Sequence, residues 1–408
     1  SAKTGFVSKH PAVASGAGAQ RGTGFRLMAS RLNSRNPHFL PRLWRLNWTL
    51  VILLLLISSI GFAMLYSAAG GNWEPWASRQ SMRLGVGVVL MIVVALIGVR
   101  IWMRAAYFVY AGALALLVAV EAFGAVRMGA QRWIDLKVIL FQPSEVMKIA
   151  LVLALARYFH SLNIEDISRP QYLLVPLLLV GAPVALVIRQ PDLGTALLLL
   201  IGGGAMFFLA GVRLWKFLVL FVGILVAAPT AWPFLRPYQQ NRVLTFLSPE
   251  RDPLGAGYNL LQSKIALGSG GMLGRGFLQG TQSHLSFLPE KHTDFIFTML
   301  AEEFGLFGGL GLMGLYVLVL LYGVAISIRS QSQFGRLVGM GVTVAFFLYV
   351  FINIAMVMGV VPVVGVPLPL ISYGGTAMVT LLGGFGLLMS IHVDRDVRMG
   401  RYGEPRDD

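Results

Sequence analysis

The sequence has no cysteine and little charge. Only 12% of its 408 residues are charged, which is about half the fraction found in soluble domains. The absence of cysteine excludes disulfides, iron–sulfur clusters and cysteine-ligated zinc, and the six histidines show no metal-ligand spacing. Because 56% of the residues are apolar, the chain has too little polar surface for a water-soluble body. We expect an integral membrane protein without redox chemistry.

Acidic residues are also scarce. The chain has 33 Lys and Arg against 18 Asp and Glu, a net charge of +15. Residues 1–47 hold eight of the basic residues and no acid, and short basic segments of membrane proteins stay in the cytoplasm. Most of the positive excess is therefore a topology signal that places both termini in the cytoplasm. Nucleic-acid binding is not expected.

Long apolar runs predict the fold. A helix that crosses the roughly 30 Å hydrocarbon core needs about 20 apolar residues. The runs lack the short alternating pattern of membrane β-barrels, so we predict an all-α polytopic membrane protein with about ten transmembrane helices. The windows are 48–67, 83–99, 105–125, 146–159, 172–188, 194–210, 214–232, 295–328, 337–359 and 372–392.

The chain divides into a tail, a membrane domain and a second tail. Residues 1–47 are predicted to be a basic, disordered cytoplasmic tail because they lack apolar periodicity. Residues 48–393 are predicted to form a single membrane domain, followed by the cytoplasmic tail 394–408. Two outside segments, 126–145 and 233–294, are long, and the second is a large extracytoplasmic loop between the seventh and eighth helices. Such long connections are usually functional or disordered.

The first polar cluster contains Glu145 and Lys148, preceded by Arg132 in the same outside segment. If a helix begins near Pro143, a residue favoured in a first turn, the two charges lie on one helix face as an i,i+3 pair. A charge in the membrane core costs about 2.5–3.5 kcal/mol on insertion scales. The pair is therefore either a mutually neutralised structural pair or part of a polar cavity that opens outward.

The second cluster is the short turn that begins with Arg189 and Gln190. Its Pro, Gly and Asp residues are typical of a tight turn, and Asp192 could cap the helix that follows. Arg189 either forms a local ion pair or presents its planar guanidinium to a phosphate.

The third cluster runs from residue 241 to residue 303. Its glycine-rich run, 268–276, is not a P-loop because Lys and Ser or Thr do not follow the second glycine, so nucleotide binding is unsupported. Asp294 is the last acid before a long apolar helix. It either caps that helix or acts as a general base at the lipid–water boundary, where partial desolvation can shift the pKa of a carboxylate. The cluster also holds Arg242, Gln262, Lys291, His292, Glu302 and Glu303.

The fourth cluster, residues 360–376, has three prolines and no charge. Irregular backbone at membrane depth is tolerated only where it is buried or lines a cavity. We expect this segment to line a cavity, where Ser372 and Tyr373 would suit an anionic or sugar-bearing headgroup.

Five motifs in these clusters resemble the SEDS family of bacterial cell-wall proteins. The resemblance covers about residues 48–393. The sequences of segments 287–292 and 364–369 are more similar to the elongation-type (RodA) members than to the division-type (FtsW) members. The motifs are Gln131-Arg132-Trp133, Gln142-Pro143-Ser144-Glu145, the run from Gln190 to Thr195, residues 289–297, and the run from Pro369 to Gly375.

The resemblance implies a peptidoglycan glycosyltransferase of the bacterial inner membrane. It implies two substrates, lipid II, which is a disaccharide-pentapeptide on undecaprenyl pyrophosphate, and undecaprenyl-pyrophosphate-linked glycan. It also implies a class B penicillin-binding protein as partner. The family's essential aspartate corresponds to Asp294, and the polar-cavity pair of the family corresponds to Glu145 and Lys148.

This chemistry needs one protein base. The leaving group is already a lipid pyrophosphate, so no protein acid has to protonate it, in contrast to glycoside hydrolysis. We expect Asp294 to accept the proton of the acceptor GlcNAc 4-hydroxyl during an inverting attack. Candidates to neutralise the pyrophosphate, alone or with a divalent cation such as Mg²⁺ or Mn²⁺, are Arg79, Arg132, Arg189 and Arg242. The other residues predicted to bind substrate are Glu145, Lys148, Gln190, Asp192, Gln262, Lys291, His292, Ser372 and Tyr373.

Other hypotheses stay open at this point. A lipid II flippase also needs polar residues in the membrane and an outward cavity, although the polar residues here cluster on the outer side and no inverted repeat is evident. A division-specific, FtsW-type polymerase is a second alternative. A scaffold for a partner's membrane helix is compatible with an enzyme, since Gly305-x-x-x-Gly309 and Gly335-x-x-x-Gly339 could serve helix packing.

Overall fold

The computed structural model describes residues 39–127, 130–135, 140–163, 165–234, 237–248, 256–280, 291–401 and 404. The chain divides into two units, with the boundary between Arg45 and Leu46. In the first unit, the short helix α2 (Phe39–Trp44) lies within the segment that was predicted to be a disordered tail. The rest of that prediction, residues 1–38, lies outside the described residues.

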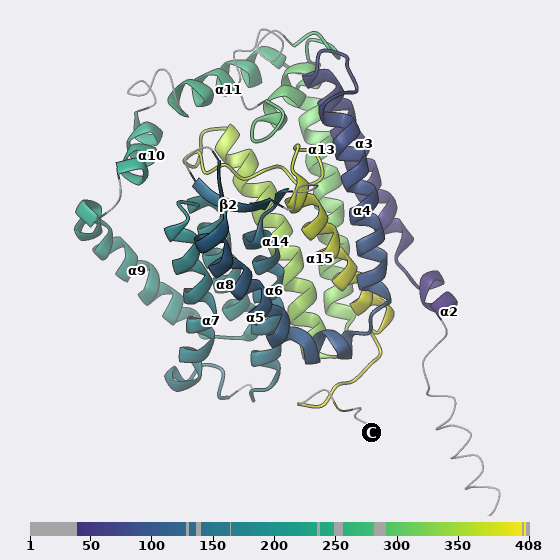
Figure 1. Cartoon of the computed structure of the whole chain (residues 1–408), viewed down its shortest axis with the longest axis vertical. Helices are drawn as coiled ribbons and strands as arrows, with labels where there is room; N and C mark the ends of the chain where they lie inside the picture. Colours follow the sequence, from purple (N-terminus) through teal and green to yellow (C-terminus); the bar gives the residue numbers. More distant parts are fainter. Residues whose placement is uncertain are drawn as a thin grey trace, which may run out of the picture. The chain divides into compact units, whose positions relative to one another are not determined.

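The second unit is a helical bundle, and the prediction of an all-helical membrane fold is confirmed (Figure 1). In the described part of the chain, eight helices are long and apolar enough to cross a membrane. Two further helices, α6 and α9, are not among these eight because α6 carries charged residues and α9 has a shorter apolar run. Together the ten helices are consistent with the predicted number. The ten helices are α3 (Trp48–Ala68), α4 (Trp76–Leu96), α5 (Val99–Phe123), α6 (Pro143–His160), α7 (Pro170–Arg189), α8 (Leu193–Ala210), α9 (Leu214–Ala231), α13 (Ile296–Arg329), α14 (Gln333–Val357) and α15 (Gly375–Val393).

Helices α6, α14 and α15 form the core of the bundle. The apolar stretches of α15 and α14 are 78% and 67% buried, whereas that of α7 is 22% buried. Helix α15 packs along α4, and α6 packs against α5, α8 and α14. Helix α9 lies at the edge (Figure 1), and its apolar side chains, such as Leu218 and Val226, are exposed. This exposure suits a helix surrounded by lipid.

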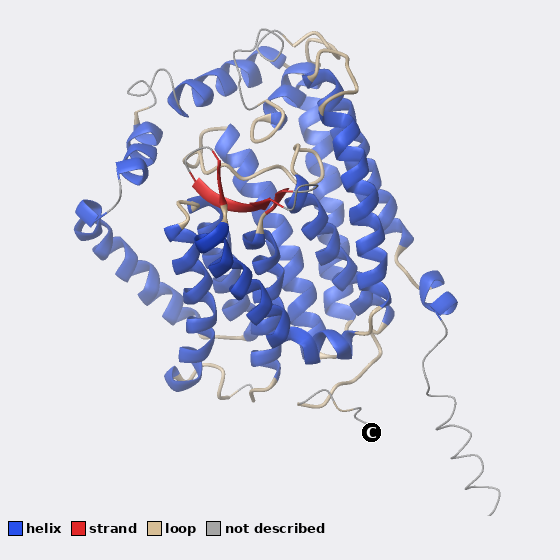
Figure 2. Ribbon diagram, viewed as in Figure 1, coloured by secondary structure: helices blue, strands red, loops and turns tan. Residues whose placement is uncertain are grey.

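The first long outside segment contains a small antiparallel sheet, which the sequence analysis did not predict. Its strands are β1 (Ala125–Arg127), β2 (Ala130–Asp135) and β3 (Leu140–Phe141), in the order β1-β2-β3 (Figure 2). Ile134 pairs with Phe141, and Asp135 with Leu140. Strands this short leave no alternating pattern long enough to recognise.

In its described residues, the long segment between α9 and α13 contains the 3₁₀ turn η1 (Trp232–Phe234) and the helices α10 (Pro237–Leu247) and α11 (Ala256–Gly270). Helix α11 packs on α13. Ser263 on α11 is fully buried, and its Oγ forms a 2.8 Å hydrogen bond with Thr298 Oγ1 and donates a 2.9 Å bond to the carbonyl of Val357. The loop is therefore anchored to two membrane helices.

Helix α13 is kinked at Gly305, where φ is 68° and ψ is −163°. Its 34 residues would span about 51 Å if straight, which exceeds the hydrocarbon core. At the kink the glycine-rich turn after α11 pairs with α13 through its backbone. The amides of Arg275 and Gly276 each donate a 3.0 Å hydrogen bond to the carbonyls of Glu302 and Glu303. The glycine run therefore allows the backbone of this turn to pack closely against α13.

Candidate functional site

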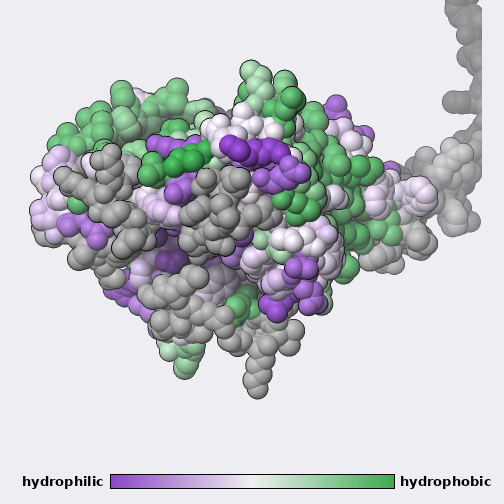
Figure 3. Space-filling model, turned by 90° about the horizontal axis from the view of Figure 1, so that it is seen from above, coloured by the Kyte–Doolittle hydropathy of each residue, from purple (hydrophilic) through white to green (hydrophobic). Residues whose placement is uncertain are grey.

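A polar cavity of about 450 Å³ lies at the end of the bundle that carries the small sheet, between that sheet, the start of α13 and the proline-rich segment 360–374. Seen from above, hydrophilic residues form several groups across this end, and hydrophobic residues lie between them and along its upper margin (Figure 3). The side chains that give the cavity its polarity are Arg132, Gln142, Glu145, Lys148, Asp192, Thr195, Arg242, Thr293, Asp294, Tyr349, Tyr373 and Thr376.

The floor of the cavity is formed by Glu145 and Lys148. Helix α6 begins at Pro143 as predicted, and the Lys148 Nζ lies 2.8 Å from Glu145 Oε1. Tyr349 of α14 joins the pair, because its hydroxyl donates to Glu145 Oε2 and accepts from Lys148. All three side chains are buried. The two predicted alternatives are therefore both met: the charges neutralise each other, and they also line a polar cavity.

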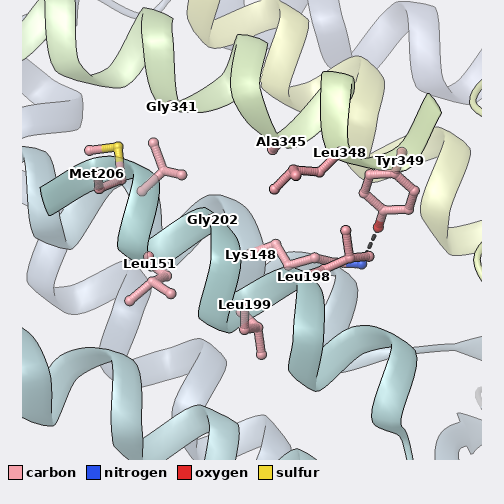
Figure 4. A pocket seen from close by; sticks show the side chains of 12 residues that line it. Lys148, Leu151, Leu198, Leu199, Gly202, Met206, Gly341, Ala345, Leu348 and Tyr349 are labelled. Atoms are coloured by element: carbon pink, nitrogen blue, oxygen red, sulfur yellow. Dashed lines mark hydrogen bonds between the residues drawn. The ribbon is translucent and has the colours of Figure 1, made fainter. Parts of the chain in front are cut away.

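Directly beyond Lys148 and Tyr349 the lining becomes apolar. A slot of about 20 Å³ lies between α6, α8 and α14 (Figure 4), with room for about one water molecule. Figure 4 shows the Lys148 side chain reaching across to the Tyr349 hydroxyl at one end of this slot, with Leu151 and Met206 further along it. The polar cavity therefore ends at the Lys148–Tyr349 contact.

A second wall is built around Asp192. Its Oδ1 accepts a 3.2 Å hydrogen bond from the backbone amide of Thr195, so the predicted cap of α8 is confirmed. Gln142 donates a 3.2 Å bond to Asp192 Oδ2. Arg132 lies 3.8 Å from Asp192 and donates to the carbonyls of Gln190 and Pro191. The arginine thus comes from the sheet and holds the turn before α8.

Asp294 lies at the rim of the cavity, in the short segment before α13. Phe295 is the N-cap residue of α13 and provides no side-chain hydrogen bond, so Asp294 lies one residue before the cap. The segment is held through its backbone. Asn353 donates a 2.9 Å hydrogen bond to the Asp294 carbonyl, and the Tyr373 amide donates one of the same length to the His292 carbonyl.

The proline-rich segment forms the wall beside Asp294, as predicted for irregular backbone at membrane depth. Residues 364–367 line the cavity, and Asn353 also donates a 2.7 Å hydrogen bond to the Val366 carbonyl. Gly365 has φ of 74°, and a Cβ atom there would lie 3.3 Å from Asp294 Oδ2. Ser372 donates to the carbonyl of Thr293. This segment therefore packs directly against the residues that carry the candidate base.

The structure brings together only part of the predicted site. Arg132, Glu145, Lys148, Asp192, Arg242, Asp294 and Tyr373 line the cavity. Ser372 and His292 lie behind its wall, where the His292 ring stacks on Trp76 with centroids 4.5 Å apart. Lys291 is half-buried beside them, and this burial lowers the pKa of its ammonium group.

Four predicted residues lie outside the cavity. Arg79 is exposed and Gln262 is half-buried on α11, and neither is part of the lining. Arg189 is 70% exposed and lies 3.8 Å from Glu121 of α5, so its acidic neighbour comes from another helix and not from its own turn. Gln190 is buried and donates to the carbonyl of Leu117 on α5, because its side chain points back into the bundle.

Several polar or aromatic cavity residues were not predicted as site residues: Trp133, Gln142, Thr195, Thr293, Tyr349 and Thr376. Trp133 stands in the quoted motif beside Arg132, so the motif itself was the available signal. Tyr349 lies in the middle of an apolar helix and gives no local signal. Among the described residues, no three His, Asp or Glu side chains lie close enough to hold a metal ion. The described residues therefore offer no protein ligand set for the divalent cation considered above.

Known proteins share both the sequence and the fold. The family model FtsW/RodA/SpoVE, a cell cycle protein family, matches residues 45–397. The chain is 47% identical to the peptidoglycan glycosyltransferase MrdB of Escherichia coli K12 over 351 residues, or 85% of this chain and 92% of that protein.

Two solved structures have a similar fold. A chain of a peptidoglycan synthase complex, described for its coordination of polymerization and crosslinking, matches with a TM-score of 0.76 and 35% identity over 86% of this chain and 98% of that chain. The crystal structure of Thermus thermophilus Rod shape determining protein RodA matches with a TM-score of 0.65 and 31% identity, over 86% and 97%. The chain therefore belongs to the FtsW/RodA/SpoVE family, which is the SEDS family that its motifs resemble.

Proposed function

We propose that this protein polymerises lipid II at the polar cavity, with Asp294 as the general base. The activity class, peptidoglycan glycosyltransfer of the RodA and MrdB type in cell elongation, follows from family membership and from 47% identity to MrdB. The proposal adds the lipid-linked substrate, the residues that act on it and the direction from which it enters. The observation that carries it is the position of Asp294 in the lining of a polar cavity that also contains Arg132 and Arg242.

The cavity supplies the charges that the reaction needs. Transfer from a lipid pyrophosphate leaves a diphosphate anion, so the departing group requires positive charge and not a protein acid. Arg132, Arg242 and Lys148 line the cavity. Lys148 is already neutralised by Glu145, with 2.8 Å between the charged atoms. Arg132 and Arg242 are only partly buried, whereas Lys148 is buried, so we assign these two arginines to the diphosphate.

Asp294 is the carboxylate that we assign as base. Its segment begins before α13, so the carboxylate lies at the outer boundary of the membrane, where a sugar headgroup can reach it. Glu145 is buried in the floor and hydrogen-bonded to Tyr349 and Lys148, and Asp192 caps α8. Both of these acids are buried, whereas Asp294 is only partly buried and so more accessible to a headgroup. Asp294 takes the proton of the acceptor hydroxyl as that oxygen attacks the anomeric carbon and the lipid diphosphate departs.

Both substrates are anchored in the same leaflet, so the membrane itself supplies part of the approximation that a soluble enzyme must obtain from binding. The rim position of Asp294 suits reactants that diffuse in the outer leaflet. We also propose that both termini are cytoplasmic, because the basic residues of 1–47 and of the C-terminal tail favour that side.

The cavity geometry favours a polymerase over a flippase. A flippase needs a polar route through the membrane. Here the polar lining stops at Lys148 and Tyr349, and the slot beyond them is apolar and holds about 20 Å³. We further propose a class B penicillin-binding protein as partner, which is supported by the similarity to a chain of a peptidoglycan synthase complex.

The test is polymerisation of purified lipid II in detergent or liposomes by the wild type and by Asp294→Asn, which keeps the size and polarity of the side chain. We expect glycan strands from the wild type and a loss of at least 100-fold in rate for the variant, since general-base catalysis contributes about 10²–10⁴-fold. Full polymerisation by the variant would refute the base assignment. Transbilayer movement of lipid II without polymer would favour the flippase.

A further inference from the structure

A glutamine of α4 is buried behind the cavity wall. Gln80 is 1% exposed, and its Nε2 donates a 2.9 Å hydrogen bond to the Ser372 carbonyl. Burial of an amide is unfavourable unless its polar atoms find partners, and in the described part of the chain Oε1 of Gln80 is buried without one. Stability alone therefore does not explain an amide at this position. The hydrogen bond to Ser372 points instead to a role at that residue.

The group that Gln80 holds is the peptide between Ser372 and Tyr373. Its carbonyl accepts from Gln80, and its N–H, on Tyr373, donates a 2.9 Å hydrogen bond to the His292 carbonyl. A peptide group is planar, so the two bonds fix one rigid unit from opposite sides. Hydrogen bonds in such a chain also polarise and strengthen each other. Gln80 therefore acts on the segment before α13 through a single peptide.

The side chain of Ser372 makes a second link to that segment. Ser372 is 3% exposed. Its Oγ accepts a 2.8 Å hydrogen bond from the Leu368 amide and donates to the Thr293 carbonyl. A hydroxyl has a single donor, and here that donor is used within the protein. Ser372 therefore links the proline-rich segment to the residue before Asp294.

Both peptide planes beside Asp294 are held in this way. The Thr293 carbonyl belongs to the plane that precedes the Asp294 Cα atom. The Asp294 carbonyl, which accepts the 2.9 Å hydrogen bond from Asn353, belongs to the plane that follows it. The orientations of the two planes define the backbone dihedrals of Asp294, and these set the direction of its Cα–Cβ bond. The carboxylate is therefore aimed by two supports, Asn353 of α14 and Ser372 backed by α4.

Gln80 belongs to a face of α4 that contacts this region along its length. Trp76, Gln80 and Arg83 are spaced four and three residues apart, so they share one helix face. The Trp76 ring stacks on His292 with centroids 4.5 Å apart, and the Arg83 guanidinium lies 4.4 Å from the centroid of the Tyr373 ring. In the described part of the chain, the lining of the cavity contains no residue of this face. The face therefore acts on the cavity through the segments that it holds.

We propose that Gln80 is a positioning residue for the general base. It holds the Ser372–Tyr373 peptide, and this peptide, together with the Ser372 hydroxyl, fixes the backbone of Thr293 and so the direction of the Asp294 carboxylate. The inference rests on the proposed function, because it takes Asp294 as the base. Gln80 touches no substrate atom, so it contributes to the rate of the reaction and not to substrate binding.

The first test compares the wild type with Gln80→Met, which keeps an unbranched, flexible side chain and removes the donor. We expect kcat for lipid II polymerisation to fall about tenfold and KM to stay within about twofold, because a small misplacement of a catalytic group slows the reaction without weakening binding. The matched control is Gln171→Met, the same substitution at an exposed position of α7, which should keep both constants. Wild-type kcat in Gln80→Met would overturn the proposal, and so would a tenfold rise in KM with unchanged kcat.

A double-mutant cycle with Ser372→Ala separates positioning from a general loss of stability. Because Gln80 acts through Ser372, the loss of kcat in the double variant should be at least threefold smaller than the product of the two single losses. Losses that multiply would overturn the proposed relay. If Gln80→Met does not purify as a folded protein, Gln80→Asn replaces it. Its amide is one methylene shorter and should not reach the Ser372 carbonyl, so the same fall in kcat is expected.

Hydrogen–deuterium exchange distinguishes failure of this inference from failure of the proposed function. The exchange of backbone amides reports how often a segment opens, whether or not polymer is made. In Gln80→Met the amides of segments 292–296 and 368–373 should exchange several-fold faster than in the wild type, while Gln171→Met leaves them unchanged. An inactive wild type, or full activity of Asp294→Asn, would refute the proposed function. Unchanged exchange in Gln80→Met would refute the support by Gln80.

Discussion

The side chain of Asn353 holds the backbone of Asp294: its Nδ2 atom donates a 2.9 Å hydrogen bond to the Asp294 carbonyl. The same atom donates a 2.7 Å bond to the carbonyl of Val366. Asn353 is fully buried in α14. A single amide in a membrane helix therefore fixes the segment that carries the candidate base and the proline-rich wall beside it.

Replacing Asn353 with Ala should lower the rate of catalysis more than it lowers thermal stability. The change leaves two carbonyls without their donor, at a cost of about 1–3 kcal/mol for each buried group that stays unpaired. Because Asp294 loses its anchor, we expect kcat for lipid II polymerisation to fall at least tenfold while KM changes less. Thermal unfolding in detergent, measured alongside kinetics, separates the two effects.

A suitable control is Asn72→Ala, since Asn72 is exposed and donates only a 3.3 Å bond to the nearby Ala69 carbonyl. It should keep the wild-type rate. Wild-type kcat in Asn353→Ala would show that the amide does not position Asp294.

The helices and the floor of the site were predictable because their signals are local. Apolar runs of membrane length mark the helices. The i,i+3 spacing of Glu145 and Lys148, with Pro143 at the helix start, was enough to predict their ion pair, now found at 2.8 Å. The irregular backbone of 360–374 signalled a cavity wall, because such backbone has no place in contact with lipid.

Contacts between distant segments were not predictable. The sequence placed Asp192 beside Arg189, whereas the structure pairs it with Arg132 from the sheet. Tyr349 and Asn353 lie in an apolar helix, and nothing local distinguishes a side chain that faces the cavity from one that faces lipid. Only the packing of α14 against α6 and α13 gives these two residues their partners.

Replacing Gly365 with Ala should impair catalysis through Asp294. The residue has φ of 74°, and a Cβ atom would lie 3.3 Å from Asp294 Oδ2. A non-glycine residue in this left-handed region costs about 1–2 kcal/mol, and the methyl group would press on the carboxylate. We expect a kcat at least tenfold lower, with a modest loss of thermal stability. Gly204→Ala is the control, because a Cβ atom there meets nothing within 4 Å. A similar fall in kcat in both variants would show that Gly365 does not act through Asp294.

The Glu145–Lys148 pair should show strong coupling. Removing either charge alone, in Glu145→Gln or Lys148→Met, leaves the other buried at 7% exposure or less, and breaking a buried pair typically costs about 3–5 kcal/mol. The double variant removes both charges, so it should regain much of the stability lost in either single variant. Polymerisation should stay low in all three, because the polar floor is lost. Additive losses of stability in a double-mutant cycle would show that the two charges are not coupled.

Replacing Gly274 with Ala should loosen the outside loop from the kink of α13. Gly274 has φ of 82°, and a Cβ atom would meet the Glu303 carbonyl oxygen. The neighbouring amides of Arg275 and Gly276 supply the 3.0 Å hydrogen bonds that pair the turn with α13. An added methyl group must push the two backbones apart. The left-handed backbone conformation costs about 1–2 kcal/mol for a non-glycine residue, and loss of the two hydrogen bonds costs about 0.5–1.5 kcal/mol each.

The control is Gly268→Ala in the same glycine run, where the added Cβ atom meets nothing within 4 Å. This control should melt at the wild-type temperature, while Gly274→Ala melts several degrees lower. Because α13 begins directly after Asp294, the loosened variant should also polymerise more slowly. An unchanged melting temperature in Gly274→Ala would mean that the paired turn adds little to the stability of the bundle.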